Sequence, residues 1–170
     1  NVNFEKIKKK LIFFKQKMFY YKFNLYHENL PWFGSKACKK KNFKSAEWIQ
    51  WIKSKKYPWW RLDTLFSNKK YSDIKFIENG GWHFTNIKSP EDIEKKLKNF
   101  VHYKDFESSG LSLNDLKNLI LQKKVMYNHS VDKKGDKWSD GEKLKTLSLN
   151  EMPEHIINNY KKYKPWLDNI

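Results

Sequence analysis

A glycine pair that directly follows an alternating strand pattern constrains this chain more than any other feature. Residues 73–78 alternate polar and apolar side chains, which predicts a strand. The chain continues Asn79-Gly80-Gly81-Trp82-His83-Phe84-Thr85, and a glycine pair lets a backbone bend or approach a ligand closely. Loops at the ends of strands often carry functional side chains. We therefore expect residues 79–84 to form such a loop.

Two side chains in this stretch suggest chemistry. Trp82 offers a flat apolar face with one polar N–H, and His83 offers a proton carrier or a metal ligand near neutral pH. The same residues also suit a turn with a buried indole and a hydrogen-bonded imidazole. Both interpretations stay open on these residues alone.

Strand and helix patterns alternate along the rest of the chain. Residues 10–26 favour one or two strands, which residues 28–31 interrupt. Ser89-Pro90-Glu91-Asp92 predicts a helix start, because serine caps, proline fits the first turn and acids favour the positive helix end. Further elements are a strand and loop at 36–44, helices after Ser45 and Ser112, an exposed loop at 128–142 and a last helix at 153–163. These patterns predict a mixed α+β fold of the α/β type, with short strands and about three to four helices.

Charge and cysteine content narrow the classes of function. The net charge of +16 invites a nucleic-acid interpretation, but the lysines are spread from Lys6 to Lys164, as a genome-wide compositional bias would leave them. A basic surface can still attract an anionic ligand. Cys38 is the single cysteine, which excludes an internal disulfide and leaves a catalytic thiol as a minor alternative. Because no apolar run reaches about 18 residues, we expect no transmembrane segment.

One guanidinium stands out against this lysine background. Arg61 is the only arginine among 35 basic residues, so we expect it to do what an ammonium cannot, such as a bidentate grip on phosphate or carboxylate. A structural pair with a nearby carboxylate such as Asp63, buried in the fold, satisfies the same logic.

The order of these signals resembles glycosyltransferase family 17, the bisecting β-1,4-mannosyl-glycoprotein β-1,4-N-acetylglucosaminyltransferases and their relatives. The resemblance rests on five segments in order and covers most of the chain. These are Trp32-Phe33-Gly34-Ser35, the aromatic segment with Arg61, Gly80-Gly81-Trp82-His83-Phe84-Thr85, a helix with Lys96-Leu97-Lys98-Asn99-Phe100 that ends at His102, and a segment around Pro153.

The resemblance implies an inverting enzyme with a GT-A-like fold, a UDP-sugar donor, a glycan acceptor and a divalent cation, Mn²⁺ or Mg²⁺. For the carboxylate base of such a transfer the candidates are Asp63, Glu78 and Asp105, and Asp63 is favoured by its closeness to Arg61. The resemblance implies a catalytic role for His83, which is also the candidate metal ligand. It further implies substrate contacts from Arg61, Trp82, Gly81, Trp32 and His102, although a histidine at a helix end is also held there by the helix dipole.

The family's Asp-x-Asp-Glu motif does not occur in the required place, since Asp136 and Asp140 are too far apart and lie in a late loop. The chain also begins with asparagine rather than methionine. We therefore expect residues 1–170 to be a single or partial domain, the acceptor-side C-terminal half of such an enzyme, inactive alone. The nucleotide-binding half would lie upstream of Asn1.

Two other functions remain as alternatives. A non-catalytic module that binds glycans or anionic polymers would use tryptophans as platforms and lysines for charge. A nucleic-acid-binding protein would show a steep dependence of affinity on salt. The lysine-rich, microbial or viral character of the sequence leads us to expect a cytoplasmic protein, with the Golgi lumen as the location only for a eukaryotic-type parent.

Overall fold

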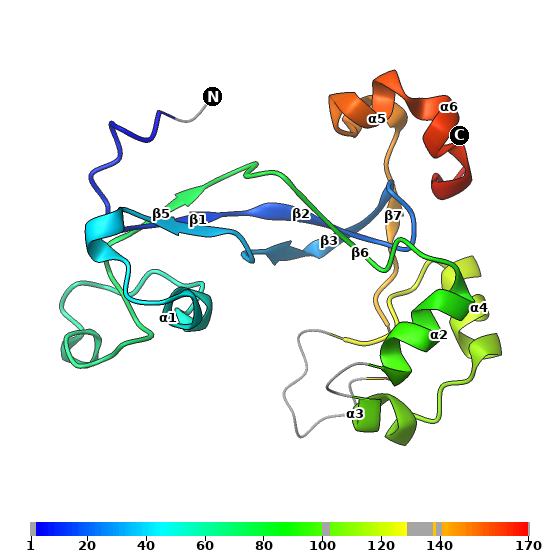
Figure 1. Ribbon diagram of the computed structural model, residues 1–170, viewed down its shortest axis with the longest axis horizontal. Helices are drawn as coiled ribbons and strands as arrows, with labels where there is room; N and C mark the ends of the chain where they lie inside the picture. Colours follow the sequence, from blue (N-terminus) through cyan, green and yellow to red (C-terminus); the bar gives the residue numbers. More distant parts are fainter. Residues whose placement is uncertain (1–2, 100–102, 129–137, 139–140, 170) are drawn as a thin grey trace. The chain divides into compact units, whose positions relative to one another are not determined.

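The computed structural model describes residues 3–99, 103–128, 138 and 141–169. In this part of the chain it contains seven β-strands and six α-helices (Figure 1). The chain divides into two compact units, unit 1 (Asn1–Gln16 and Pro31–Gly81) and unit 2 (Lys17–Leu30 and Trp82–Ile170). The predicted mixed α and β composition is therefore confirmed, while the described residues hold more helices than the three to four expected.

Unit 1 contains a three-stranded sheet with the order β4-β1-β5. β1 (Leu11–Phe14) pairs antiparallel with β4 (Lys36–Cys38) and parallel with β5 (Ile74–Ile77). Helix α1 (Ala46–Trp51) begins after Ser45, whose side chain accepts a hydrogen bond from the Trp48 amide at 3.0 Å. The core of this unit consists of Leu11, Phe13, Ile52 and Ile74, with Trp48, Ile49 and Phe76 among the residues packed against it.

Unit 2 is built on a four-stranded sheet with the order β6-β2-β3-β7. The strands are β2 (Gln16–Tyr20), β3 (Leu25–Trp32), β6 (Trp82–Thr85) and β7 (Lys145–Thr146). β6 runs parallel to β2, and β7 runs antiparallel to β3.

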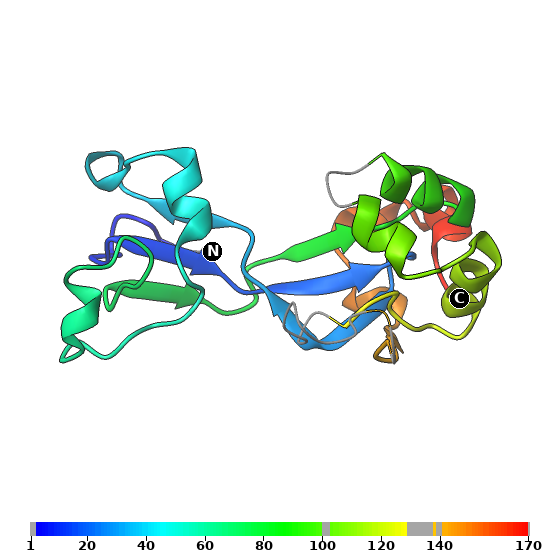
Figure 2. The same ribbon diagram turned by 90° about the horizontal axis from the view of Figure 1, so that it is seen from below.

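Helices cover both faces of the unit 2 sheet, as Figures 1 and 2 show in two views. On one face lie α2 (Pro90–Lys98), α3 (Tyr103–Ser108) and α4 (Leu113–Leu121). On the other lie α5 (Glu154–Asn158) and α6 (Tyr160–Tyr163), where Phe19 packs with Leu147, Met152, Ile156 and Leu167.

The predicted helix starts are confirmed in detail. The Ser89 hydroxyl accepts a hydrogen bond from the Asp92 amide, and Pro90 occupies the first turn of α2. Ser112 and Asp115 form a reciprocal capping box at α4. The strands predicted at 10–26, 36–44 and 73–78 are also present as β1, β2, β4 and β5.

Several element boundaries differ from the prediction. β3 continues through Pro31, which lies far from the residues of β3 that pair with β7, Leu25 and Tyr26. Residues 82–85 form β6 and not a loop. The last helix is interrupted at Asn159, and α3 was not predicted. The loop predicted at 128–142 lies mostly outside the described residues.

Candidate functional site

The glycine pair lies in the segment that joins β5 to β6, which is longer than the matching segment that joins β1 to β2. Leu11 pairs with Ile74 and Lys17 with Trp82, so the segment from β5 to β6 has two more residues than the segment from β1 to β2. The backbone accommodates the two additional residues by a bend in which Asn79 and Gly81 have positive φ values, 51° and 119°. Gly80 donates its amide to the Lys15 carbonyl at 2.8 Å. The expected bend is therefore present, and it ends directly before Trp82.

Gly80 lies against the backbone of β1. A Cβ atom at this position would stand 2.7 Å from the Phe14 Cβ and 2.8 Å from the Phe14 Cα. Gly81 has more space, but its φ of 119° is one that side chains rarely adopt. The two glycines are thus required for different reasons, close approach at one and conformation at the other.

Trp82 and His83 lie on opposite faces of the unit 2 sheet. In a strand, successive side chains alternate faces, and Phe84 contacts the Phe19 ring at 5.2 Å on the face covered by α5 and α6. Trp82 shares that face and is 42% exposed. His83 is half-buried on the face of α2 and pairs in register with the buried Met18. β6 is the outermost strand at one edge of this sheet in the described part of the chain, so a ligand at the edge can reach both residues.

His83 lies in a cationic environment. Burial, and secondly the charge of Lys96, lower the pKa of His83 below its usual value of 6.5, so the imidazole is neutral at pH 7. The Lys96 ammonium donates to the Asn86 Oδ1 at 2.7 Å. Lys96 is exposed, but partial burial of its ammonium, and secondly the charge of Lys88, lower its pKa. In the described residues no carboxylate forms an ion pair with Lys96, so the site favours an anionic ligand.

Arg61 and Asp63 come together at the surface of unit 1. The Arg61 Nε donates to Asp63 Oδ1 at 2.9 Å and its Nη2 to Oδ2 at 2.7 Å. The Lys70 ammonium also donates to Asp63 Oδ2 at 2.7 Å. The structural ion pair expected between Arg61 and Asp63 is therefore present. It is exposed rather than buried, with 45% and 39% of the two side chains accessible. The guanidinium also lies over the Tyr57 ring, 5.4 Å from its centroid.

These contacts make Asp63 a weak base in this arrangement. Hydrogen bonds from Arg61 and from Lys70 lower its pKa from 3.8 to about 2. A carboxylate with that pKa has little tendency to take a proton from a hydroxyl near pH 7. The catalytic role assigned to Asp63 therefore requires that ligand binding first draws Arg61 or Lys70 away.

The other predicted site residues are spread over the chain. Trp32 is half-buried at the end of β3, and its indole covers Gly34. Glu78 pairs with Lys15 at 2.9 Å and is exposed, and Asp105 lies in the first turn of α3. His102 lies outside the described residues. Arg61, Asp63, Trp32 and Gly81 thus belong to unit 1, and Trp82 and His83 to unit 2.

The described part of the chain does not bring together a donor set for a divalent cation. Among the described residues, no three histidine, cysteine, aspartate or glutamate side chains cluster so that they could hold a metal ion. Cys38 is half-buried in β4, and burial raises the pKa of its thiol, which disfavours a reactive thiolate. The described helices include none long and apolar enough to cross a membrane.

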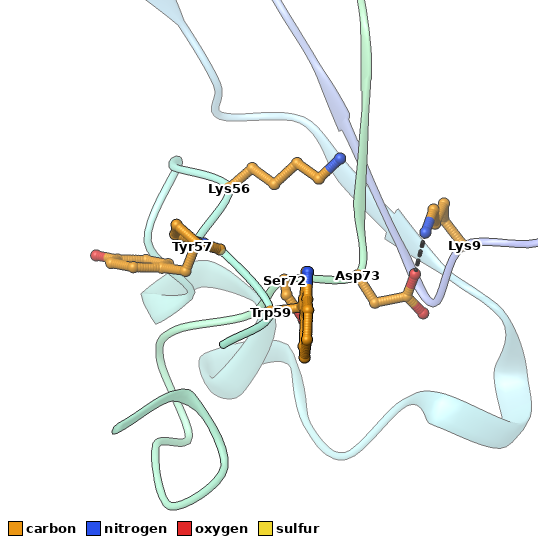
Figure 3. Close-up of a pocket in the computed structure, with 7 residues that line it drawn as sticks. Lys9, Lys56, Tyr57, Trp59, Ser72 and Asp73 are labelled. Atoms are coloured by element: carbon orange, nitrogen blue, oxygen red, sulfur yellow. Dashed lines mark ion pairs between the residues drawn. The ribbon is translucent and has the colours of Figure 1, made fainter. Parts of the chain in front are cut away.

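An open pocket in unit 1 was not predicted from the sequence. It has a volume of about 270 Å³ and is lined by Lys9, Lys56, Tyr57, Pro58, Trp59, Ser72 and Asp73 (Figure 3). Its lining comes from residues 56–59, from residues 72–73 and from Lys9 in the N-terminal segment. The aromatic run Tyr57-Pro58-Trp59-Trp60 is a visible signal in the sequence, but it does not say which indole borders a cavity.

Comparison of the chain with models of protein families, with curated proteins and with solved structures found no match.

Proposed function

We propose that this chain is the acceptor-side part of an inverting glycosyltransferase that transfers a sugar, N-acetylglucosamine in the first instance, from a UDP-sugar to a glycan acceptor. The proposal includes a GT-A-like fold for the complete enzyme and a cytoplasmic location. One observation supports it above the others: a neutral, half-buried His83 follows the glycine bend directly, and the charge of the Lys96 ammonium acts on its imidazole. Such a pair suits an anionic leaving group.

The roles follow from where each side chain lies. Lys96, held by Asn86, supplies positive charge for a diphosphate, and the neutral imidazole of His83 can hydrogen-bond a phosphate or a hydroxyl. Trp82 presents an exposed indole on the opposite face at the sheet edge, where it can stack on a sugar ring. For Arg61 the proposed role is to bind a phosphate, which would take the place of the Asp63 carboxylate with similar geometry.

The divalent cation of the proposed reaction does not fit the described residues, since they offer no cluster of three suitable ligands. We assign the cation and its acidic ligands to the nucleotide-binding half of the enzyme. The chain alone is then expected to bind sugars without transferring them.

The test compares the 170-residue chain with the complete enzyme that we propose it is part of, called the full-length parent. We expect the 170-residue chain to give no product from UDP-N-acetylglucosamine and a glycan acceptor, and the full-length parent to give product. In the parent, His83→Ala and Lys96→Gln should each lower kcat/KM at least tenfold. His155→Ala and Lys98→Gln are matched controls: His155 contacts Tyr163 and Lys98 pairs with Glu94. A parent with no transfer from any nucleotide sugar, or controls that lose as much activity, would refute the proposal.

A specific observation favours one second candidate, a non-catalytic glycan-binding module. Trp59 is 81% exposed and borders the unit 1 pocket, and exposed indoles with one accessible face suit sugar recognition. The parent decides between the two: binding of glycans without any transfer activity favours the module, whereas transfer favours the enzyme.

A further inference from the structure

The unit 1 pocket combines an aromatic platform with charge, and the proposed transfer chemistry uses neither. Trp59 is 81% exposed although it lies beside the pocket. In Figure 3 its ring stands at the border of the open space, while the Tyr57 ring points away from it. Trp60 packs edge-on against Trp59 at 6.3 Å and does not line the pocket. Trp59 is therefore the more exposed indole of the two and the one that borders the pocket.

The charged side chains that line the pocket differ in whether they form an ion pair. Asp73 pairs with the Lys9 ammonium at 3.0 Å and accepts the Lys10 amide at 3.2 Å, so this carboxylate is already engaged. Lys56 extends along the pocket in Figure 3 and makes no ion pair within the described part of the chain. Two ammonium groups and one carboxylate leave the lining with a net positive charge, which favours an anion.

The size of the cavity limits the ligand. A volume of about 270 Å³ lies just below the usual range for small-molecule sites, which begins at about 300 Å³. One sugar ring with a small substituent suits this space better than an oligosaccharide. The flat apolar face of a pyranose matches the exposed face of an indole, and hydroxyl groups match Ser72 and the rim.

We propose that the pocket binds one pyranose ring that carries a carboxylate or a phosphate, with the ring stacked on Trp59 and the anion bound by Lys56. The inference rests on the proposed function only for its class of ligand, because it names a kind of sugar that the chain binds. It concerns binding alone, so it can fail while transfer activity stands, and it can hold if transfer is never found.

The experiment follows the indole N–H signals of the 170-residue chain by NMR during titration. The probes are N-acetylglucosamine, N-acetylglucosamine 6-phosphate and glucuronic acid, which share a ring and differ in charge. We expect the Trp59 signal to shift with all three, and at least one anionic sugar to bind three- to fivefold more tightly than the neutral sugar. The anionic sugar that binds more tightly shows whether the pocket prefers a phosphate or a carboxylate. Raising the salt concentration should remove that advantage.

Matched variants separate the two contacts. Trp59→Ala should weaken all three sugars about tenfold, whereas Trp60→Ala should change none of them more than twofold. Lys56→Gln should bring the anionic sugars to the affinity of the neutral sugar, and Lys55→Gln should not. Because these side chains are exposed, unchanged amide spectra are expected for every variant. Equal affinity for neutral and anionic sugars, no saturable shift at Trp59, or equal effects of Trp59→Ala and Trp60→Ala would each overturn the proposal.

Discussion

At the scale of single residues, hydrogen-bonding neighbours set the pKa of some exposed carboxylates, whereas burial is the main cause of the pKa shift of His83. Asp63 is exposed, yet hydrogen bonds from Arg61 and Lys70 bring its pKa to about 2. His83 is half-buried, and its pKa is lowered by burial before the charge of Lys96 is counted. The lone arginine could be identified from the sequence, and so could its nearest carboxylate. The third member, Lys70, could not be identified, since nothing distinguishes it among 34 lysines.

The Asp63 carboxyl should titrate near pH 2, well below the usual 3.8. Because the pKa of Asp63 is lower in the folded chain than in the unfolded chain, its contacts with Arg61 and Lys70 stabilise the fold. This contribution to the free energy of unfolding is complete above about pH 4 and is lost as the pH falls through 2. Arg61→Gln should raise the midpoint, since the largest contribution is the Arg61 hydrogen bond. Lys69→Gln is the control, because Lys69 lies over Trp51 instead. Carboxyl NMR titration measures this, and a wild-type midpoint at 3.8 or above would contradict the arrangement.

His83 should titrate below 6.5, and Lys96→Gln should raise its midpoint while Lys98→Gln leaves it unchanged. The unfolded chain binds a proton at about 6.5, but the folded chain does so only at lower pH. The free energy of unfolding should therefore fall as the pH drops from 7.5 to 5.5. Urea unfolding at the two pH values should show a smaller fall in His83→Gln. Part of the fall remains, because burial also lowers the pKa of His27.

At the scale of elements, local signals were sufficient where one segment determines its own structure. Ser89 and Ser112 were identified as caps because the capping hydrogen bonds join residues three positions apart. Residues 82–85 were misassigned for the opposite reason. Their strand exists because they pair in register with residues 17–20, a partner about 65 positions away that no local pattern specifies. The same distance hides the fact that Trp82 and His83 fall on opposite faces.

The glycine bend yields a prediction about stability. Gly80→Ala should place a methyl group 2.7 Å from the Phe14 Cβ, and Gly81→Ala must adopt a φ of 119°. We expect each to lower the free energy of unfolding by about 2–3 kcal/mol. Gly110→Ala is the control, with a φ of 69° and open space around it, and should cost about 1 kcal/mol. Denaturant unfolding compares the three, and a Gly80→Ala variant no less stable than Gly110→Ala would exclude the close approach.

At the scale of the whole molecule, the two units are interleaved in sequence. Unit 1 takes residues 1–16 and 31–81, and unit 2 takes 17–30 and 82–170. The glycine pair Gly80-Gly81 lies at one crossing between the units and Pro31 at another. Neither is a long linker, so composition predicts one domain where the contacts form two compact groups. The candidate site residues follow the same division. The order of motifs along the chain does not reveal this division, because it depends on strand pairings between residues far apart in the sequence.

Separate cores predict separate responses to core substitutions. Phe13 is fully buried in the unit 1 core with Leu11, Ile52 and Ile74, whereas Ile156 packs with Phe19, Leu147 and Met152 in unit 2. Phe13→Ala and Ile156→Ala should each cost about 2–5 kcal/mol. Because the two clusters share no residue, we expect Phe13→Ala to reduce amide protection in β1 and β5, and Ile156→Ala to reduce it in β2 and β3. Native-state hydrogen exchange reads both sets of amides in one experiment. If each variant lowers protection equally in all four strands, the units unfold as one cooperative body, and the division of the core into two parts has no energetic meaning.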